Sequence, residues 1–474
     1  MKKKIRAALP VFLLALCLAA PPPASATVQA STQNTAASAS GTQESLNGYV
    51  TVNGKTYYYK NGTKHTGRVK IDGVYYYFRN GVMKKSYWYT SASGNKYYFR
   101  ANGQMAVGRV KIKGTYYYFN TKGKMVTSKK VNINGKYYYF NAKGKMVTSK
   151  RVKINNSYYY FNAKGKMVTS KKVKINDNYY YFGSNGKMVT GLQSIDGASY
   201  YFGSNGKMLT GLQKIDGNYY YFSSSGKQYT GWLTDESGNQ YYFDEQTGIR
   251  VTGKQTISHY IRYFDSNGVL YRSVDMDGKM VAVTYDDGPS ANTSTILKTL
   301  KQYNAVATFF VVGNRVSTYA STVKAAYDQG CEIGNHTWEH LILTRYSAST
   351  IQSQISRTNA AVKAVTGVSP VIMRPPGGNY NSTVKSAVNM PLINWSIDTR
   401  DWATRSASST ISAVLNYVKD GDIILMHDLY ASTAEASKTI IPSLISKGYQ
   451  LVTVSELAEC RGGMTNGTVY TCFR

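Results

Sequence analysis

The sequence predicts a multidomain chain in which an N-terminal, all-β solenoid of β-hairpins is followed by an α/β domain. The first observation is a repeat, because a phenylalanine that closes an aromatic cluster returns every 20 or 21 residues from Phe78 to Phe264. The second is a change near residue 275, where short apolar runs begin to alternate with helical stretches. The third is charge: residues 1–274 hold 40 Lys and Arg against 10 Asp and Glu, whereas residues 275–474 hold 17 against 15.

Residues 1–26 have the pattern of a secretory signal peptide. A basic start precedes an apolar run over residues 7–20, and Ala24-Ser25-Ala26 is a small-x-small cleavage site. The run is short for a bilayer-spanning helix and no other stretch is long enough, so we expect a secreted chain with no transmembrane anchor. Residues 27–47 are rich in Ala, Ser, Thr and Gln, which predicts a disordered linker.

Residues 48–273 are expected to form the repeat array. Asp72-Gly73 and Asn134-Gly135 stand just before aromatic clusters, and such pairs favour tight hairpin turns because both residues tolerate positive φ. A hairpin this small buries its apolar face only against its neighbours. The array is therefore expected to stack into an elongated β-solenoid.

Residues 274–474 are expected to form the α/β domain. Buried strands are indicated by apolar runs at residues 281–284, 307–312, 371–373 and 423–426. Between them, segments such as residues 349–366 carry apolar side chains at helical spacing. Strand–helix alternation over this length predicts parallel strands that close into a barrel.

Five short motifs in this domain carry the candidate chemistry. They are Thr284-Tyr285-Asp286-Asp287-Gly288, His336-Thr337-Trp338-Glu339-His340, Arg374-Pro375-Pro376-Gly377-Gly378, Asp398-Thr399-Arg400-Asp401-Trp402 and Leu425-Met426-His427-Asp428. His336 and His340, spaced i and i+4, can present two imidazoles to one metal ion, and the Asp286-Asp287 pair can supply a carboxylate. Two His and one carboxylate leave coordination positions open, as in catalytic metal sites. The set favours one divalent ion, Zn²⁺ first, with Co²⁺ or another divalent ion as the alternative.

Together and in this order, the motifs resemble those of the polysaccharide deacetylases, the NodB-type enzymes of carbohydrate esterase family 4. The resemblance covers about the last 200 residues and implies a distorted (β/α)7 barrel with its chemistry beyond the C-terminal ends of the strands. It implies a general base, an arginine that orients it, a general acid and an aspartate that supports that acid. In this order, these residues are Asp286, Arg374, His427 and Asp401. The resemblance also implies that the second aspartate of the pair, Asp287, is a metal ligand together with His336 and His340.

The same resemblance implies three substrate contacts. The backbone N–H of Gly377 would hold the oxyanion, although many relatives have a tyrosine at this position, and Trp402 with Leu425 would wall the acetyl pocket. The implied activity is metal-dependent hydrolysis of N-acetyl groups on a cell-wall glycan, foremost N-acetylglucosamine of peptidoglycan. N-acetylmuramic acid, chitin-type oligosaccharides, an exopolysaccharide and acetylated xylan stay open as alternatives.

The repeats resemble the choline- and glucan-binding cell-wall repeats of Gram-positive surface proteins, which implies a wall-associated location. Choline-binding members use a Gly-Trp pair to build an aromatic cage. Here Gly231-Trp232 keeps the tryptophan, and the pairs that we align with it carry Arg, Lys or Leu. They are Gly67-Arg68, Gly108-Arg109, Ser128-Lys129, Ser149-Lys150, Ser170-Lys171, Gly191-Leu192 and Gly211-Leu212. Cations there would repel choline, so the expected ligand is an anionic wall polymer, and export argues against nucleic acid.

Two alternative functions remain. The inverted zinc-protease signature also fits His336-Thr337-Trp338-Glu339-His340, with Glu339 as the base, and it requires a long helix at these residues. A non-catalytic surface protein with an inactive domain is the competing class, although no ligand or base is missing. Cys460 and Cys472 are close enough in sequence for a disulfide, with three free thiols as the alternative. The sequence leaves the oligomeric state open.

Overall fold

The computed structural model describes residues 46–474, so the predicted signal peptide and nearly all of the predicted linker lie outside the described residues. The chain divides into two compact units. One unit contains the described residues up to Val152 together with Tyr160–Met167. The other contains Lys153–Tyr159 and Val168–Arg474. No helix in the described part of the chain is both long enough and apolar enough to cross a bilayer.

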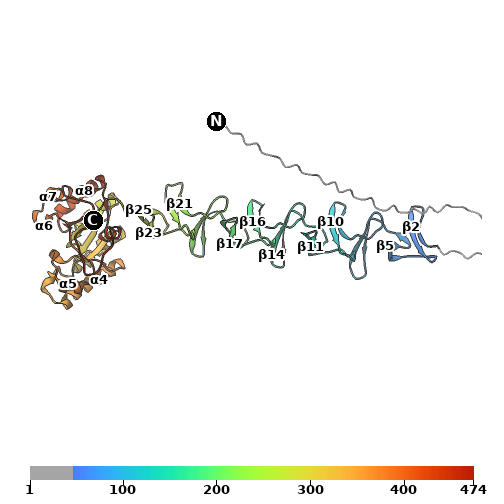
Figure 1. Cartoon of the computed structure of the whole chain (residues 1–474), viewed down its shortest axis with the longest axis horizontal. Coiled ribbons are helices and arrows are strands. Elements are labelled where there is room, and N and C mark those ends of the chain that lie inside the picture. Colours follow the sequence, from blue (N-terminus) through green and yellow to red (C-terminus); the bar gives the residue numbers. More distant parts are fainter. Residues whose placement is uncertain (1–45) are drawn as a thin grey trace, which may run out of the picture. The chain divides into compact units, whose positions relative to one another are not determined.

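The repeats are antiparallel β-hairpins, coloured blue to yellow-green in Figure 1. Their strands are β1 (Gly48–Val52), β2 (Lys55–Lys60), β3 (Thr63–Lys64), β4 (Gly67–Ile71), β5 (Val74–Arg79), β6 (Val82–Met83), β7 (Tyr87–Thr90), β8 (Lys96–Phe99), β9 (Gly108–Ile112), β10 (Thr115–Phe119), β11 (Lys129–Ile133), β12 (Lys136–Phe140), β13 (Lys150–Ile154), β14 (Ser157–Phe161), β15 (Lys171–Ile175), β16 (Asn178–Phe182), β17 (Gly191–Ile195), β18 (Ala198–Phe202), β19 (Gly211–Ile215), β20 (Asn218–Phe222), β21 (Gly231–Thr234), β22 (Gln240–Phe243), β23 (Gly253–Ile257), β24 (Tyr260–Phe264) and β25 (Leu270–Asp275). In the turn between β4 and β5, Asp72 and Gly73 have φ of 48° and 82°, which confirms the predicted tight turn.

Successive hairpins bury the aromatic cluster between them. The phenylalanine that closes each cluster is fully buried, as Phe119 and Phe140 illustrate. Backbone bonds also connect neighbours: Met146 N–H donates to Tyr116 O at 2.9 Å, and Met188 N–H donates to Tyr158 O at 2.8 Å. Neighbouring hairpins therefore bury one another's apolar side chains and share backbone hydrogen bonds, as predicted. The solenoid as a whole stays a prediction.

The strand register corrects the alignment of the repeats. Trp232 faces Tyr242, and the residues that face the corresponding tyrosine elsewhere are Lys130 and Lys172 rather than Lys129 and Lys171. The shift arises because Ser128 and its counterparts, with φ near +47°, add one residue before the strand. Trp88 faces Tyr98, so this hairpin also keeps the tryptophan, contrary to the expectation that Trp232 alone does so.

The C-terminal domain contains a six-stranded sheet whose main path runs β28-β27-β26-β31-β30, with β32 paired to β26, and every pairing is parallel. Single bridges continue from Asn335 in β28 through Met373 to β29, which pairs with β33. Within residues 46–474 no pairing joins the outer strands β30 and β33, so the parallel sheet is confirmed and barrel closure stays a prediction. The strands are β26 (Met280–Asp286), β27 (Thr308–Val311), β28 (Glu332–Asn335), β29 (Leu392–Ile393), β30 (Ile397–Asp398), β31 (Ile423–His427), β32 (Gln450–Leu451) and β33 (Val469–Tyr470).

Helices cover this sheet, with α4 and α5 on one side of the domain in Figure 1 and α6, α7 and α8 on the other. They are α1 (Thr293–Gln302), α2 (Gly313–Val316), α3 (Ala320–Asp328), α4 (Ala348–Thr366), α5 (Ser382–Val388), α6 (Asp401–Thr404), α7 (Ala407–Leu415), α8 (Ala431–Ser446) and α9 (Val454–Cys460), with 3-10 turns η1 (Leu343–Arg345) and η2 (Pro376–Gly378). Strand β26 is apolar over its first four residues, Met280 to Val283, and all four are fully buried, as expected for a parallel strand covered on both faces.

The last hairpin is packed into the core of this domain. Ile261 of β24 and Val274 of β25 belong to the same buried cluster as Met280 and Ala282 of β26. Beside them, Arg272 Nη2 donates to Glu456 Oε2 of α9 at 2.8 Å, and both side chains are at least nine-tenths buried. Tyr263 also donates to Glu456. A buried ion pair and shared apolar side chains therefore fasten β23–β25 to the α/β domain.

Of the two alternatives that the sequence leaves open for the cysteines, the structure has the second. Cys331, Cys460 and Cys472 are free thiols. Cys460 ends helix α9, where it packs against an apolar cluster, whereas Cys472 pairs through its backbone with Asp422. Proximity in sequence did not bring the two side chains together, because a helix fixes one and a β-bridge fixes the other.

Candidate active site

The five motifs meet at the C-terminal ends of the parallel strands. Asp286 is the last residue of β26 and lies opposite His427, the last residue of the neighbouring strand β31. His336 follows β28, Arg374 follows the bridge at Met373, and Asp401 begins α6 just beyond β30. Since parallel strands end at one edge of a sheet, this arrangement brings together side chains that are far apart in sequence.

The predicted metal ligands converge. Asp287 Oδ1 lies 3.2 Å from His336 Nε2 and 3.0 Å from His340 Nε2. The three ligand atoms lie within 4.8 Å of one another. Asp287 and His340 adopt positive φ, 71° and 56°, which is uncommon for side-chain-bearing residues and concentrates backbone strain at the cluster.

The surroundings of Asp287 fit a cation. His336 Nδ1 donates to Arg374 O at 2.7 Å, which orients Nε2 toward the Asp287 carboxylate. Asp287 Oδ1 is buried and has no hydrogen-bond partner among the described residues, although it lies 3.2 Å from His336 Nε2. A buried carboxylate oxygen without a donor, beside two imidazole nitrogens, fits a bound cation. The nitrogen and oxygen donors suit Zn²⁺ or a related divalent ion.

Asp286 is held by a buried arginine. Arg374 Nη1 donates to Asp286 Oδ1 and to Thr284 Oγ1, both at 2.7 Å, and both charged side chains are almost wholly buried. Arg374 also donates to two backbone carbonyls, those of Ile393 and Asn394, at 3.0 Å. Burial lowers the pKa of the Arg374 guanidinium, and the charge of Asp286 opposes that shift. Asp286 Oδ2 is left facing the cluster, 3.7 Å from His336 Nε2.

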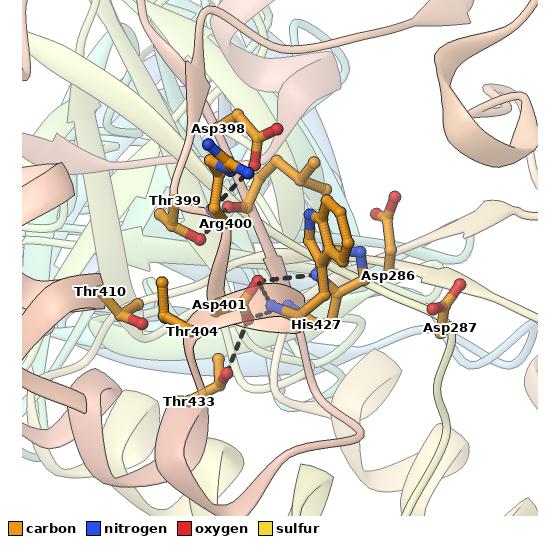
Figure 2. A network of polar contacts seen from close by, with 12 residues as sticks. Asp286, Asp287, Asp398, Thr399, Arg400, Asp401, Thr404, Thr410, His427 and Thr433 are labelled. Atoms are coloured by element: carbon orange, nitrogen blue, oxygen red, sulfur yellow. Dashed lines mark hydrogen bonds and ion pairs between the residues drawn. The ribbon is translucent and has the colours of Figure 1, made fainter. Parts of the chain in front are cut away.

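His427 has its own carboxylate partner, shown in Figure 2. Its Nδ1 lies 2.8 Å from Asp401 Oδ1, and its backbone N–H donates to Asp401 Oδ2 at 2.8 Å. Thr433 donates to the same Oδ2 at 2.6 Å, so the fully buried carboxylate is fixed from two sides. Burial lowers the pKa of His427, but the hydrogen bond to Asp401 and the charge of Asp286 outweigh burial and raise the pKa above its ordinary value.

A pocket of about 370 Å³ unites these groups. Its lining residues are Asp286, Asp287, His336, His340, Gly377, Trp395, Asp398, Trp402, Leu425, His427 and Tyr430. Gly377, with φ of 64°, donates its N–H to no acceptor in the described part of the chain. Leu425 is buried and Trp402 is exposed, so the two predicted wall residues form a floor and a rim.

Several residues of the site were not assigned by the sequence. Trp395 and Tyr430 line the pocket, and neither lies in one of the five motifs. Asp398 also lines the pocket and lies in a motif, but the sequence assigned it no role. Thr284 directly precedes the Asp-Asp pair, which is a signal that sequence reading could have used. Thr433 has no such signal because it reaches Asp401 from α8.

The inverted zinc-protease reading is wrong. Residues 336–340 form a loop after β28 rather than the helix that this signature requires. Glu339 Oε2 accepts a hydrogen bond from Gln354 Nε2 at 2.7 Å, and Glu339 is absent from the pocket lining. The glutamate therefore supports the loop.

Both parts of the chain are similar to known proteins. The polysaccharide deacetylase family model matches residues 273–392, and the choline-binding repeat model matches residues 89–129, 130–171, 189–211 and 209–250. Peptidoglycan-N-acetylmuramic acid deacetylase PdaC of Bacillus subtilis is 41% identical over 190 residues, 40% of this chain and 41% of that protein. Peptidoglycan-N-acetylglucosamine deacetylase PgdA of Listeria monocytogenes is 42% identical over 180 residues, 38% of this chain and 39% of that protein.

A shorter relative is covered almost completely. A peptidoglycan-N-acetylglucosamine deacetylase of Bacillus cereus is 36% identical over 202 residues, which make up 41% of this chain and 94% of that protein. The chain belongs to the polysaccharide deacetylase family and joins that domain to choline-binding-type repeats. It matches about two fifths of the length of PdaC and PgdA.

Proposed function

We propose that the chain is a secreted, wall-associated and metal-dependent N-deacetylase of cell-wall glycan, with N-acetylglucosamine of peptidoglycan as its substrate. One observation carries this proposal. A carboxylate fixed by a buried arginine and an imidazole fixed by a buried carboxylate line the same pocket as the Asp287, His336 and His340 cluster. A base, an acid and a cation at one point are suited to the hydrolysis of an amide by an activated water.

Asp287, His336 and His340 would hold the ion, with Zn²⁺ as the proposed metal and Co²⁺ as the alternative. When bound, such an ion lowers the pKa of a coordinated water and polarises the acetyl carbonyl. Asp286 accepts the proton of the attacking water through Oδ2, because Arg374 occupies Oδ1. The N–H of Gly377 donates to the carbonyl oxygen as negative charge develops on it.

His427 then protonates the departing nitrogen of the sugar through Nε2, since Nδ1 is bonded to Asp401. The C–N bond breaks, acetate leaves, and the glycan keeps a free amine. The raised pKa of His427 keeps a larger share of the imidazole protonated at neutral pH, as a general acid requires. Trp402 and Leu425 enclose the acetyl methyl group.

The choice of substrate rests on the repeats and the relatives. Relatives named for N-acetylglucosamine and for N-acetylmuramic acid both share about two fifths identity with this domain, so the domain alone separates these sugars poorly. Repeats that bind the wall would hold the enzyme at peptidoglycan and raise its effective concentration there. The alternative is another acetylated glycan.

An Asp287→Asn variant separates catalysis from wall binding. Asparagine tolerates the positive φ of Asp287 and removes its charge, so the variant should fold, sediment with purified walls and release no acetate. If the variant releases acetate at the wild-type rate, the proposed metal centre is wrong. If the unaltered chain with Zn²⁺ or Co²⁺ releases no acetate from peptidoglycan or chito-oligosaccharides, the non-catalytic surface protein is the better account.

A further inference from the structure

The repeats carry a recurring arrangement of one cation and two aromatic rings. Arg68 lies with its guanidinium carbon 5.2 Å from the ring centre of Tyr75, in its own hairpin, and 5.0 Å from that of Tyr97, in the next hairpin. We call such a cation, with the rings around it, a station. Tyr97 is buried and Arg68 is exposed, so each station has a fixed floor and an accessible charge.

The same geometry returns at the same strand position. Arg109 lies 5.1 Å from the Tyr116 ring and 4.9 Å from the Tyr138 ring. In the other compact unit, Lys172 lies over two rings in the same way, at 5.2 Å and 5.6 Å. Three stations with matching distances show that this strand position can place a cation over two rings, whereas Leu192 and Leu212 hold the same position in β17 and β19.

In two hairpins a tryptophan holds the strand position that Arg68 holds in its hairpin, and the cation comes from another strand. At Trp232, Arg262 of β24 lies 5.2 Å from the indole. At Trp88, Lys96 stands where other hairpins place a tyrosine, beside an open pocket of about 290 Å³. The lining of that pocket is Trp88, Thr90, Lys96, Tyr117, Met125 and Lys143. Each of these sites therefore keeps a cation beside aromatic rings although the residues exchange places.

We propose that the stations bind the repeated anionic groups of a wall polymer, phosphodiesters above all, and reject quaternary ammonium ligands. In a site built for an ammonium ligand, the space over the rings is left free for it. Here Arg68, Arg109 and Lys172 occupy that space with their own charge. The rings hold each cation in place and shield one side of it, while the exposed side offers N–H donors to an anion. Residues 48–273 hold 36 Lys and Arg against 9 Asp and Glu, and this excess of basic residues adds long-range attraction for a polyanion.

The test is binding of the full chain to a soluble poly(glycerol phosphate), followed by titration calorimetry. The variant Arg68→Gln with Arg109→Gln and Lys172→Gln removes three station cations. Because each charge-assisted contact is worth more than a neutral one, the variant should bind at least about tenfold more weakly. The matched control, Lys122→Gln with Lys164→Gln and Lys187→Gln, removes three exposed charges from turns and should lose less than about threefold.

Equal losses in the two triple variants would show that only net charge matters and would overturn the stations. Choline chloride should neither bind nor displace the polymer, and displacement by choline would overturn the rejection of ammonium ligands. Polygalacturonate of similar charge density distinguishes a carboxylate source, since tighter binding to it would overturn the phosphodiester assignment. Acetate release from short chito-oligosaccharides should be unchanged in both variants, so this proposal can fail while the proposed enzyme activity stands.

Discussion

Replacing Asp401 by asparagine tests how the site prepares its acid. Asp401 is fully buried, lies 2.8 Å from His427 Nδ1 and accepts from the His427 backbone and from Thr433. An opposite charge at such a distance changes a pKa by roughly 1–3 units. The Asp401→Asn variant keeps the volume but loses the charge, so the pKa of His427 should fall by at least about one unit. Loss of an effective general acid should lower kcat by about 100-fold at neutral pH.

The assay is the pH profile of kcat for acetate release at saturating metal. A general acid works only below its pKa, so the alkaline limb of the profile should move to lower pH in the Asp401→Asn variant. Thr433→Val is the control, because it removes one donor to Asp401 and leaves the charge, and kcat should change by less than about threefold. An alkaline limb that stays in place while kcat falls would refute the role of Asp401 charge and leave only a packing role.

Three further predictions concern binding and stability. Arg272→Met leaves the buried Glu456 carboxylate without its cation and should lower the free energy of unfolding in urea by about 3–5 kcal/mol. Lys254→Met, at an exposed ion pair, should lower it by less than about 1 kcal/mol, and equal losses would contradict the buried junction. Burial raises the pKa of Asp428 to about 7. Between about pH 4 and about 7 this carboxyl is ionised in the unfolded chain and protonated in the folded one, so the free energy of unfolding should fall by about 1.4 kcal/mol per pH unit. Asp428→Asn should remove that slope, and unchanged pH dependence in metal-free protein would contradict it. Asp287→Asn should weaken Zn²⁺ binding by more than about 100-fold in calorimetry, since even loss of an outer partner costs 10–100-fold, and unchanged affinity would place the ion elsewhere.

The repeat hairpins were predictable because their cause is local. Asp-Gly and Asn-Gly turns set the reversal and a fixed phenylalanine sets the period, as Asp72 and Phe78 illustrate. The residue that takes the position of Trp232 in the other hairpins was not predictable in the same way. Alignment of Ser128 with glycine gives this position to Lys129. The pairing of the strands, in which Lys129 faces Phe140, gives it to Lys130.

The site was predictable where residues directly follow strands. Asp286 and His427 end neighbouring parallel strands, and the apolar runs that precede them are visible in the sequence. Trp395 and Thr433 were not predictable, because a loop and a helix remote in sequence bring them to the pocket and to Asp401. Whether Cys460 and Cys472 form a disulfide could not be decided from the sequence for a related reason: the orientation of a cysteine depends on the element that holds it.

The most direct test of the account is acetate release from purified peptidoglycan, with Zn²⁺, with Co²⁺ and with a chelator. The free amines of the product are labelled by dinitrophenylation before acid hydrolysis, and the labelled amino sugar is then identified. The account predicts release that requires the metal and free amines on glucosamine. Free amines confined to muramic acid would contradict the proposed sugar. Release that persists in chelator, after the metal has been shown to be removed, would contradict the metal-dependent mechanism at the centre of the account.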